Sequence, residues 1–254
     1  MTKGLIPTVL IAIAVALPLH AGTLVDLTHS FDAKTIYWPT AKPFTLEVVH
    51  KGPTPGGFWY EANNICAAEH GGTHVDAPVH FAKGQWTVDQ IPPERLIGPV
   101  AVIDVSKRAL KNPDYLISAE DILAWEKAHA AIAPGTMAFV YTGWSKKWPN
   151  KKAYLGTDKP GDVANLHFPG FSPEAANLLV ERKIAAAGLD TPSVDYGQSK
   201  DFKTHVILAA ANILGFENLN QLDHLPATGA KVYALPMKIA GGSGAPLRIF
   251  AELP

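Results

Sequence analysis

The segment between positions 70 and 80 concentrates side chains that could bind a metal ion. It reads His70-Gly-Gly-Thr-His74-Val-Asp76-Ala-Pro-Val-His80. Two histidines four residues apart would share one face of a helix, as in zinc proteases, but the intervening glycines and the nearby proline favour an extended chain. Side chains alternate along an extended chain, so the three histidines and the aspartate lie on one face. Because neighbours on one face are about 7 Å apart, convergence on one ion needs a bend, which Gly71-Gly72 and Pro78 can supply.

This set of side chains indicates an open metal site. Imidazole and carboxylate ligands suit zinc, manganese or iron. A single cysteine, Cys66, cannot supply the cysteine cluster of a closed structural zinc site, and we expect it to be a small buried side chain. A metal with an open position lowers the pKa of its bound water to near 7, which makes that water a nucleophile. The alternative is a polar surface strand whose histidines are each satisfied by local hydrogen bonds.

Short apolar runs separated by proline and glycine predict the elements that position this segment. Strands are expected at residues 23–27, 45–50, 64–67, 100–105, 137–141, 185–189 and 231–234. Helices are expected at residues 118–128, where acidic residues follow Ser118, at 172–183, where Pro173 takes the first position, and from near His205. Strands and helices interleave, which predicts a mixed α/β domain.

Composition restricts the class of protein. The chain has 254 residues, a formal net charge of -1 and 47% hydrophobic residues, so it can bury a full core. The dense basic patch formed by Lys146-Lys147 and Lys151-Lys152 is interpreted as a solvated loop face. We therefore expect no nucleic-acid partner.

The N-terminus has the pattern of a secretory signal. A basic start is followed by an uncharged apolar run that ends at Leu19, and then by His20-Ala21-Gly22. We expect a signal peptide at residues 1–21 and a mature domain at residues 22–254, located in the periplasm or outside the cell. An uncleaved membrane anchor is the alternative, although the apolar run is too short to favour a permanent membrane span.

The metal-binding segment is similar to a family signature. The pattern His-x-Gly-Thr-His-x-Asp-x-Pro-x-His stands without a gap at positions 70–80. It resembles the signature of the cyclase-like metal hydrolases, which include bacterial kynurenine formamidases and isatin hydrolases. Weaker similarities are Tyr37-Trp38-Pro39, Asp190-Thr-Pro-Ser-Val-Asp195 and Gly241-Gly-Ser-Gly-Ala-Pro246-Leu-Arg248. The resemblance covers most of the mature chain and implies a single α/β domain of swivelling β/α/β type and a homo-oligomer.

The resemblance also implies the ligand set. In the formamidase branch, a later histidine and a glutamate twelve residues beyond it complete a two-metal site, and His205 and Glu217 have that spacing. The first ion, Zn²⁺ or Mn²⁺, would be bound by His70, His74 and Asp76, with Asp76 able to bridge. The second ion would be bound by His205 and Glu217, giving two ions per chain.

A continuous helix cannot connect these last two residues. It would separate His205 from Glu217 by roughly 18 Å, too far for them to share an ion. We therefore expect the chain to reverse near Ala211-Asn212, since asparagine tolerates the left-handed conformation that ends a helix. Residues 213–216 would then return as a strand.

Together these features predict a hydrolase that cleaves a small amide with metal-activated water. His80 would shuttle the proton, and could also contact the second metal. The main expectation is an arylformamidase acting on an N-formylkynurenine-type substrate, as in tryptophan catabolism. The alternatives are a lactam or lactone hydrolase like isatin hydrolase, and a non-catalytic periplasmic metal- or ligand-binding module. The resemblance implies that Glu217 favours the formamidase branch, because isatin hydrolases lack the corresponding glutamate. Val206 departs from the formamidase pattern, and Thr40-Ala41 depart from the pattern of the whole family.

Aromatic residues near the signature could bind an aromatic substrate. An apolar wall could be formed by Tyr37, Trp38, Phe58, Trp59 and Tyr60, although core or subunit-interface positions are the alternative for each. Ser193 and Ser243 lie outside any nucleophile-elbow motif, so we interpret them as turn or hydrogen-bonding residues rather than nucleophiles.

Overall fold

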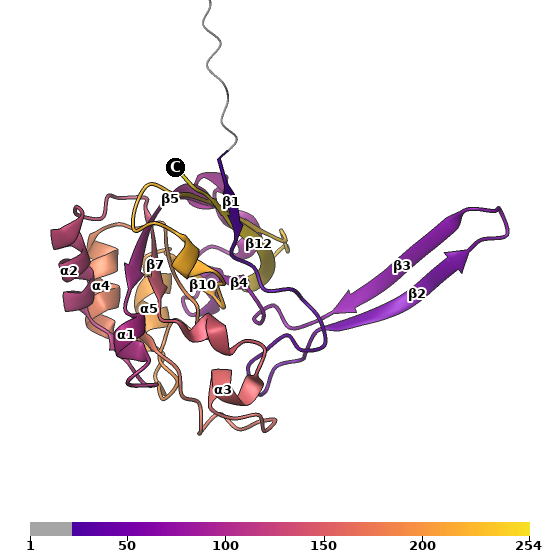
Figure 1. Ribbon diagram of the computed structural model, residues 1–254, viewed down its shortest axis with the longest axis horizontal. Coiled ribbons are helices and arrows are strands. Elements are labelled where there is room, and N and C mark those ends of the chain that lie inside the picture. Colours follow the sequence, from indigo (N-terminus) through magenta and orange to yellow (C-terminus); the bar gives the residue numbers. More distant parts are fainter. Residues whose placement is uncertain (1–21) are drawn as a thin grey trace, which may run out of the picture.

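One mixed β-sheet organises the chain in the computed structural model, which describes residues 22–254 (Figure 1). The predicted signal peptide at residues 1–21 lies outside the described residues. Within residues 22–254, the structure contains no helix with the length and hydropathy needed to cross a membrane.

The sheet has eight strands in residues 22–254, and its two ends are joined through β4. Its order is β1 (Leu24–Asp26), β12 (Gly244–Glu252), β11 (Lys231–Pro236), β5 (Ile97–Asp104), β7 (Met137–Tyr141), β9 (Ala186–Leu189), β10 (Leu214–Glu217) and β4 (His74–Asp76). Neighbouring strands from β5 to β10 are parallel, and the other pairs are antiparallel. Because β4 also pairs with β12, the sheet has a barrel-like core. This confirms the predicted mixed α/β fold.

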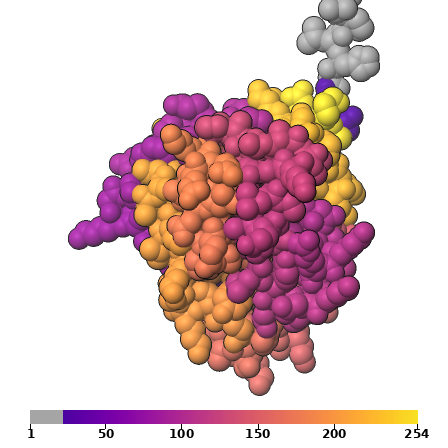
Figure 2. Space-filling view, turned by 90° about the vertical axis from the view of Figure 1, so that its left-hand side faces the viewer, coloured from indigo at the N-terminus to yellow at the C-terminus, as the bar shows by residue number. Residues whose placement is uncertain are grey.

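Both faces of the parallel strands are covered, as alternation along β7 shows. Met137 and Phe139 pack into the interior cluster with residues of β11 and β12, whereas Ala138 and Val140 pack against the helices. The helices of the described chain are α1 (Ser106–Ala109), α2 (Ala119–Ala128), α3 (Lys151–Leu155), α4 (Pro173–Glu181) and α5 (Lys203–Ala210). Figure 2 shows the helical face, where the segments of α2 and α4 lie side by side.

The two helices predicted from their start signals are confirmed. The Ser118 hydroxyl accepts a hydrogen bond from the Asp121 amide at the start of α2, and Ser172 caps α4 in the same way, with Pro173 at the first position. A side-chain oxygen at this position satisfies an amide that has no partner within the helix. The helix predicted to end at residue 183 ends two residues earlier, at Glu181.

A long hairpin projects from the body (Figure 1). We call this hairpin the arm; it consists of β2 (Thr45–Pro53) and β3 (Trp59–Cys66). Both strands were predicted, but they are longer than residues 45–50 and 64–67. The expectation that Cys66 is buried is wrong, because this residue lies exposed at the base of the arm.

The C-terminal segment differs most from the sequence-based prediction. No strand is predicted beyond residue 234, yet residues Gly244–Glu252 form the long strand β12, which pairs with β1, β11 and β4. Two further short strands, β6 (Leu116–Ile117) and β8 (Gly170–Phe171), form a separate parallel pair. Glycine and proline weaken a local strand pattern, whereas β12 is stabilised by pairing with distant segments.

Candidate metal centre

Strand β4 carries the middle of the signature into the body of the protein. It lies between β10 and β12, and its residues His74 to Asp76 are buried. On one side Gly72 adopts a left-handed conformation, with φ 58°, and on the other Pro78 begins a short 3₁₀ helix that ends at His80. The predicted bends at the glycines and at Pro78 are therefore confirmed.

The reversal predicted after His205 is also confirmed. Helix α5 ends at Ala210, Asn212 adopts a left-handed conformation with φ 53°, and β10 returns toward the site. Antiparallel pairing places Glu217, the last residue of β10, opposite His74. Two segments far apart in the sequence thus bring potential metal ligands to one place.

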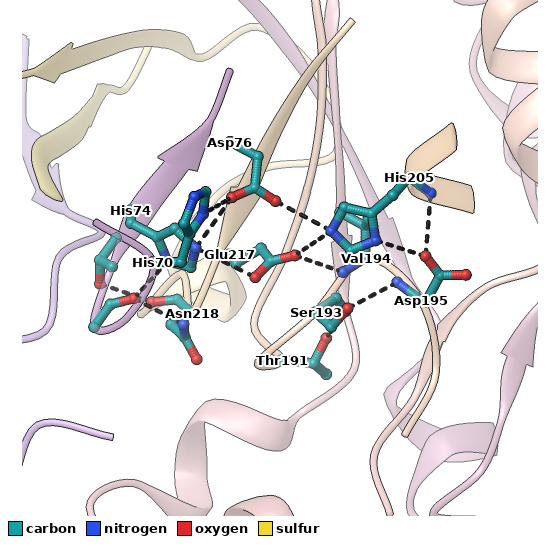
Figure 3. Close-up of polar contacts among 12 residues, drawn as sticks. His70, His74, Asp76, Thr191, Ser193, Val194, Asp195, His205, Glu217 and Asn218 are labelled. Atoms are coloured by element: carbon teal, nitrogen blue, oxygen red, sulfur yellow. Dashed lines mark hydrogen bonds and ion pairs between the residues drawn. The ribbon is translucent and has the colours of Figure 1, made fainter. Parts of the chain in front are cut away.

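The first group of potential metal ligands consists of His70, His74 and Asp76 (Figure 3). The distance from His70 Nδ1 to Asp76 Oδ1 is 2.6 Å, and that from His74 Nε2 to the same oxygen is 3.2 Å. One ligand atom from each residue lies within 4.8 Å of the other two. The group therefore has a geometry in which one ion could contact all three side chains.

The second group consists of Asp76, His205 and Glu217. His205 Nε2 lies 3.2 Å from Asp76 Oδ2 and 3.3 Å from Glu217 Oε1. Asp76 belongs to both groups, with Oδ1 turned toward the first and Oδ2 toward the second. This arrangement would allow its carboxylate to bridge two ions.

Hydrogen bonds at the far side of the ligands fix the orientation of the rings. His205 Nδ1 lies 2.6 Å from Asp195 Oδ2, and His74 Nδ1 lies 3.0 Å from the carbonyl oxygen of Gly72. The Val194 amide donates to Glu217 Oε1 at 2.9 Å. Such contacts direct the Nε2 atoms of both rings toward the centre, as outer partners of metal-binding histidines do.

Buried carboxylates dominate the electrostatics of the centre. Burial lowers the pKa of His74, but hydrogen bonding to Asp76 and the charges of Asp76 and Glu217 outweigh burial and raise this pKa to about 9. Burial also opposes the charge on His205, yet hydrogen bonds to Asp195, Asp76 and Glu217 raise its pKa well above the usual range. The pKa of Glu217 is raised by burial and by Asp76. The centre therefore favours positive charge.

A divalent ion fits these residues. His74 Nε2 is buried and makes no well-aligned hydrogen bond within residues 22–254, although it lies 3.2 Å from Asp76 Oδ1 and 3.4 Å from Glu217 Oε2. A buried polar atom without a partner is costly, and a metal ion would satisfy it. The donor set of imidazoles and carboxylates is the one that zinc and manganese accept.

His80 lies beside the ligands and outside both ligand groups of the described chain. Its ring stacks on that of His70, with centroids 3.8 Å apart and an interplanar angle of 19°. Burial lowers the pKa of His80 to about 4, and the neighbouring histidines reinforce this effect against the charge of Asp76. The ring is therefore neutral at pH 7 in the metal-free protein. Its predicted contact with the second metal stays a prediction.

A cavity of about 290 Å³ opens onto the centre. Tyr37 and Trp38 line it, as predicted, together with Phe81 and Phe202, which the sequence-based analysis missed. Phe81 directly follows His80 in the sequence, and this proximity was an available signal. Phe202 is brought in by α5, and its ring centroid lies 5.4 Å from that of Phe81.

Three predicted members of the aromatic wall lie elsewhere. Phe58, Trp59 and Tyr60 lie at the tip of the arm, are exposed, and do not line this cavity. Their prediction was wrong because proximity in the sequence is a poor guide when a hairpin carries residues away from its base. Their alternative interpretation as interface residues is compatible with their exposure.

The comparisons with known proteins identify the family. Residues 25–196 match the family model described as "Putative cyclase". The chain therefore belongs to the cyclase family.

Its relatives are hydrolases. The chain is 37% identical over 206 residues to isatin hydrolase from Roseibium aggregatum, covering 78% of this chain and 77% of the relative. It is 26% identical over 231 residues to kynurenine formamidase from Salinibacter ruber, covering 89% and 95%. The crystal structure of an isatin hydrolase bound to the product analogue thioisatinate matches with a TM-score of 0.85 and 32% identity, covering 92% of this chain and 93% of that chain. The chain is thus a cyclase-family hydrolase.

Proposed function

We propose that this protein is a metal-dependent hydrolase that opens a cyclic aromatic amide of the isatin type. The observation that carries the proposal is the buried group of histidines and carboxylates on the wall of a cavity lined with aromatic side chains. The higher identity to isatin hydrolase than to kynurenine formamidase supports a lactam over an N-formyl amine. This reverses the order of the two activities expected from the sequence.

The proposed chemistry adds water to the amide carbonyl and breaks the C–N bond of the ring. A divalent ion, Zn²⁺ or Mn²⁺, held by His70, His74 and Asp76, would polarise the carbonyl and activate the water. Neutral His80 takes the proton from the attacking water and passes it to the departing nitrogen. The product carries a carboxylate and an amine on one molecule. Phe81 and Phe202 hold the aromatic ring and exclude water.

Arylformamidase activity is the second candidate. The observation that favours it is the group of Asp76, His205 and Glu217, which provides the ligands for a second ion. The resemblance to the family implies this two-metal arrangement, with its glutamate, for the formamidases. Sequence identity therefore favours an isatin-type substrate, whereas the second group of potential ligands favours an N-formyl amine. An assay of both substrates decides between them.

The experiment uses the chain from Gly22 onward. Elemental analysis gives the metal content per chain, and the same sample is assayed with isatin and with N-formylkynurenine. We expect bound Zn²⁺ or Mn²⁺, activity that a chelator abolishes, and a kcat/KM at least tenfold higher for isatin. A preference for N-formylkynurenine would favour the second candidate. Protein that stays inactive after reconstitution with Zn²⁺ and with Mn²⁺ would indicate a non-catalytic binding module.

We also propose that the protein forms a homo-oligomer through the arm. An isolated two-stranded hairpin is marginally stable in water, and the arm exposes the large apolar side chains of Leu46, Val48, Val49, Phe58, Trp59, Tyr60 and Ile65. Leu46 pairs with Ile65, and Val48 follows on the same face of the hairpin. Changing these three residues to serine should convert a dimer to a monomer in light scattering. A variant that keeps the wild-type mass would exclude this face as the interface.

Export is a further proposal. It rests on the signal-like pattern at residues 1–21. N-terminal sequencing of protein from the periplasmic fraction of a bacterial host should give a start near Gly22. Full-length protein in the membrane fraction would instead support an uncleaved anchor.

A further inference from the structure

A serine far from the signature contacts the first metal-binding histidine. Ser243 lies in the turn that precedes β12, and its Oγ atom is 2.9 Å from His70 Nε2. The Ser243 hydroxyl donates to Glu69 Oε2 at 2.6 Å, and the Ser243 amide donates to the same oxygen at 3.0 Å. Glu69, Ser243 and His70 therefore form a continuous chain of hydrogen bonds that ends at the metal centre.

The donor and acceptor in each of these hydrogen bonds follow from the chemistry of the side chains. A carboxylate can only accept, so the single hydroxyl hydrogen of Ser243 points to Glu69. The Ser243 oxygen then accepts from His70, which places a hydrogen on Nε2. The other ring nitrogen, Nδ1, faces Asp76 Oδ1 at 2.6 Å.

We infer that Ser243 and Glu69 are positioning residues that orient His70 and select its Nδ1 atom for metal binding. This inference rests on the proposed metal-dependent function. His70 would then differ from the other two histidines in the atom that binds the metal. Nδ1 of His74 already contacts the carbonyl oxygen of Gly72, and Nδ1 of His205 already contacts Asp195. Those two rings present Nε2 to the metal, whereas His70 presents Nδ1.

The two glycines beside Ser243 allow the close approach that the chain of hydrogen bonds needs. A Cβ atom at Gly244 would overlap the ring of His70, and one at Gly242 would lie 2.9 Å from Glu69 Oε1. The Ser243 carbonyl also accepts a hydrogen bond from the Ala77 amide at 2.9 Å, which anchors the turn to the signature. The glycine–serine–glycine order is thus explained by packing against His70 and Glu69.

The test compares three variants with wild-type protein. Ser243→Ala removes the hydroxyl, Glu69→Gln removes the carboxylate charge, and Ser106→Ala on α1 is the matched control. Affinity for Zn²⁺ and for Mn²⁺ is measured by competition with a chelator, and thermal unfolding of the metal-free proteins checks folding. We expect Ser243→Ala to weaken metal binding by about 10- to 100-fold, Glu69→Gln to weaken it less, and the control to match wild type.

A second measurement reports the ligand atom directly. Long-range ¹H–¹⁵N correlation spectra of the Zn²⁺-loaded protein distinguish the two ring nitrogens, and His70 should show hydrogen on Nε2. Metal affinity of Ser243→Ala within twofold of wild type, or hydrogen on Nδ1 of His70, would overturn the inference while leaving the metal site intact. Wild-type protein that binds neither ion would overturn the proposed function together with the role of these two residues.

Discussion

The metal-free protein should lose stability as pH rises from 6.5 to 8. The pKa of a histidine is ordinarily 6.5, as in the unfolded chain, whereas that of His74 is about 9 in the folded protein. A pKa raised on folding contributes stability that is fully present below pH 6.5 and lost as pH rises through 9. Linkage gives a loss of about 1–2 kcal/mol from His74 between pH 6.5 and 8. His205, whose pKa is also raised, adds to this loss, whereas His29 and His80, whose pKa values burial lowers to about 4, offset part of it.

The assay is thermal unfolding of chelator-treated protein at constant ionic strength. For a chain of this size the loss corresponds to a Tm about 5 °C lower at pH 8 than at pH 6.5. Measurements stop at pH 8, because burial lowers the pKa of Lys147 to about 8 and its contribution opposes the trend at higher pH. The variant His74→Gln should reduce the dependence of Tm on pH, whereas His224→Gln, which changes an exposed histidine, should leave that dependence unchanged.

Binding of Zn²⁺ should counteract this loss of stability with rising pH. An imidazole must lose its proton to bind a metal, so the increase in Tm caused by saturating Zn²⁺ should grow from pH 6.5 to 8. A metal-free wild-type protein whose Tm is constant or higher at pH 8 would refute the reasoning, because the buried carboxylates would then not be holding protons on His74 and His205.

Three substitutions test individual roles. Glu217→Gln should reduce the metal content from two ions to one per chain, and unchanged metal content together with unchanged turnover would rule out the two-metal assignment. His80→Ala should lower kcat by about 10²- to 10⁴-fold while metal content survives, and loss of both would make His80 a ligand instead. Gly71→Ala should destabilise the fold by about 1–3 kcal/mol in urea unfolding, because the added Cβ would overlap the Tyr37 ring; Gly98→Ala, with ordinary contacts, is the control.

Much of the fold and of the centre follows from patterns within short segments. The helix starts at Ser118 and Ser172 depend on residues within one turn, and the reversal at Asn212 depends on the conformation that asparagine tolerates. The ligand residues could be named for a similar reason. Three of them, His70, His74 and Asp76, lie within seven residues, and the other two, His205 and Glu217, stand twelve residues apart, as the resemblance to the formamidases implies.

The features that the sequence did not reveal depend on contacts between distant segments. Ser243 and His70 are 173 positions apart, and only the pairing of β12 with β4 brings them together. The arm illustrates the opposite case, since it carries Trp59 out to its tip although this residue is close to the signature in sequence. Propensity, capping and alternation act over a few residues, so the sequence alone determined the class of fold and identified the potential metal ligands. Packing of distant strands and helices decided which side chains surround the metal ligands, because that choice minimises the free energy of the whole chain rather than of any one segment.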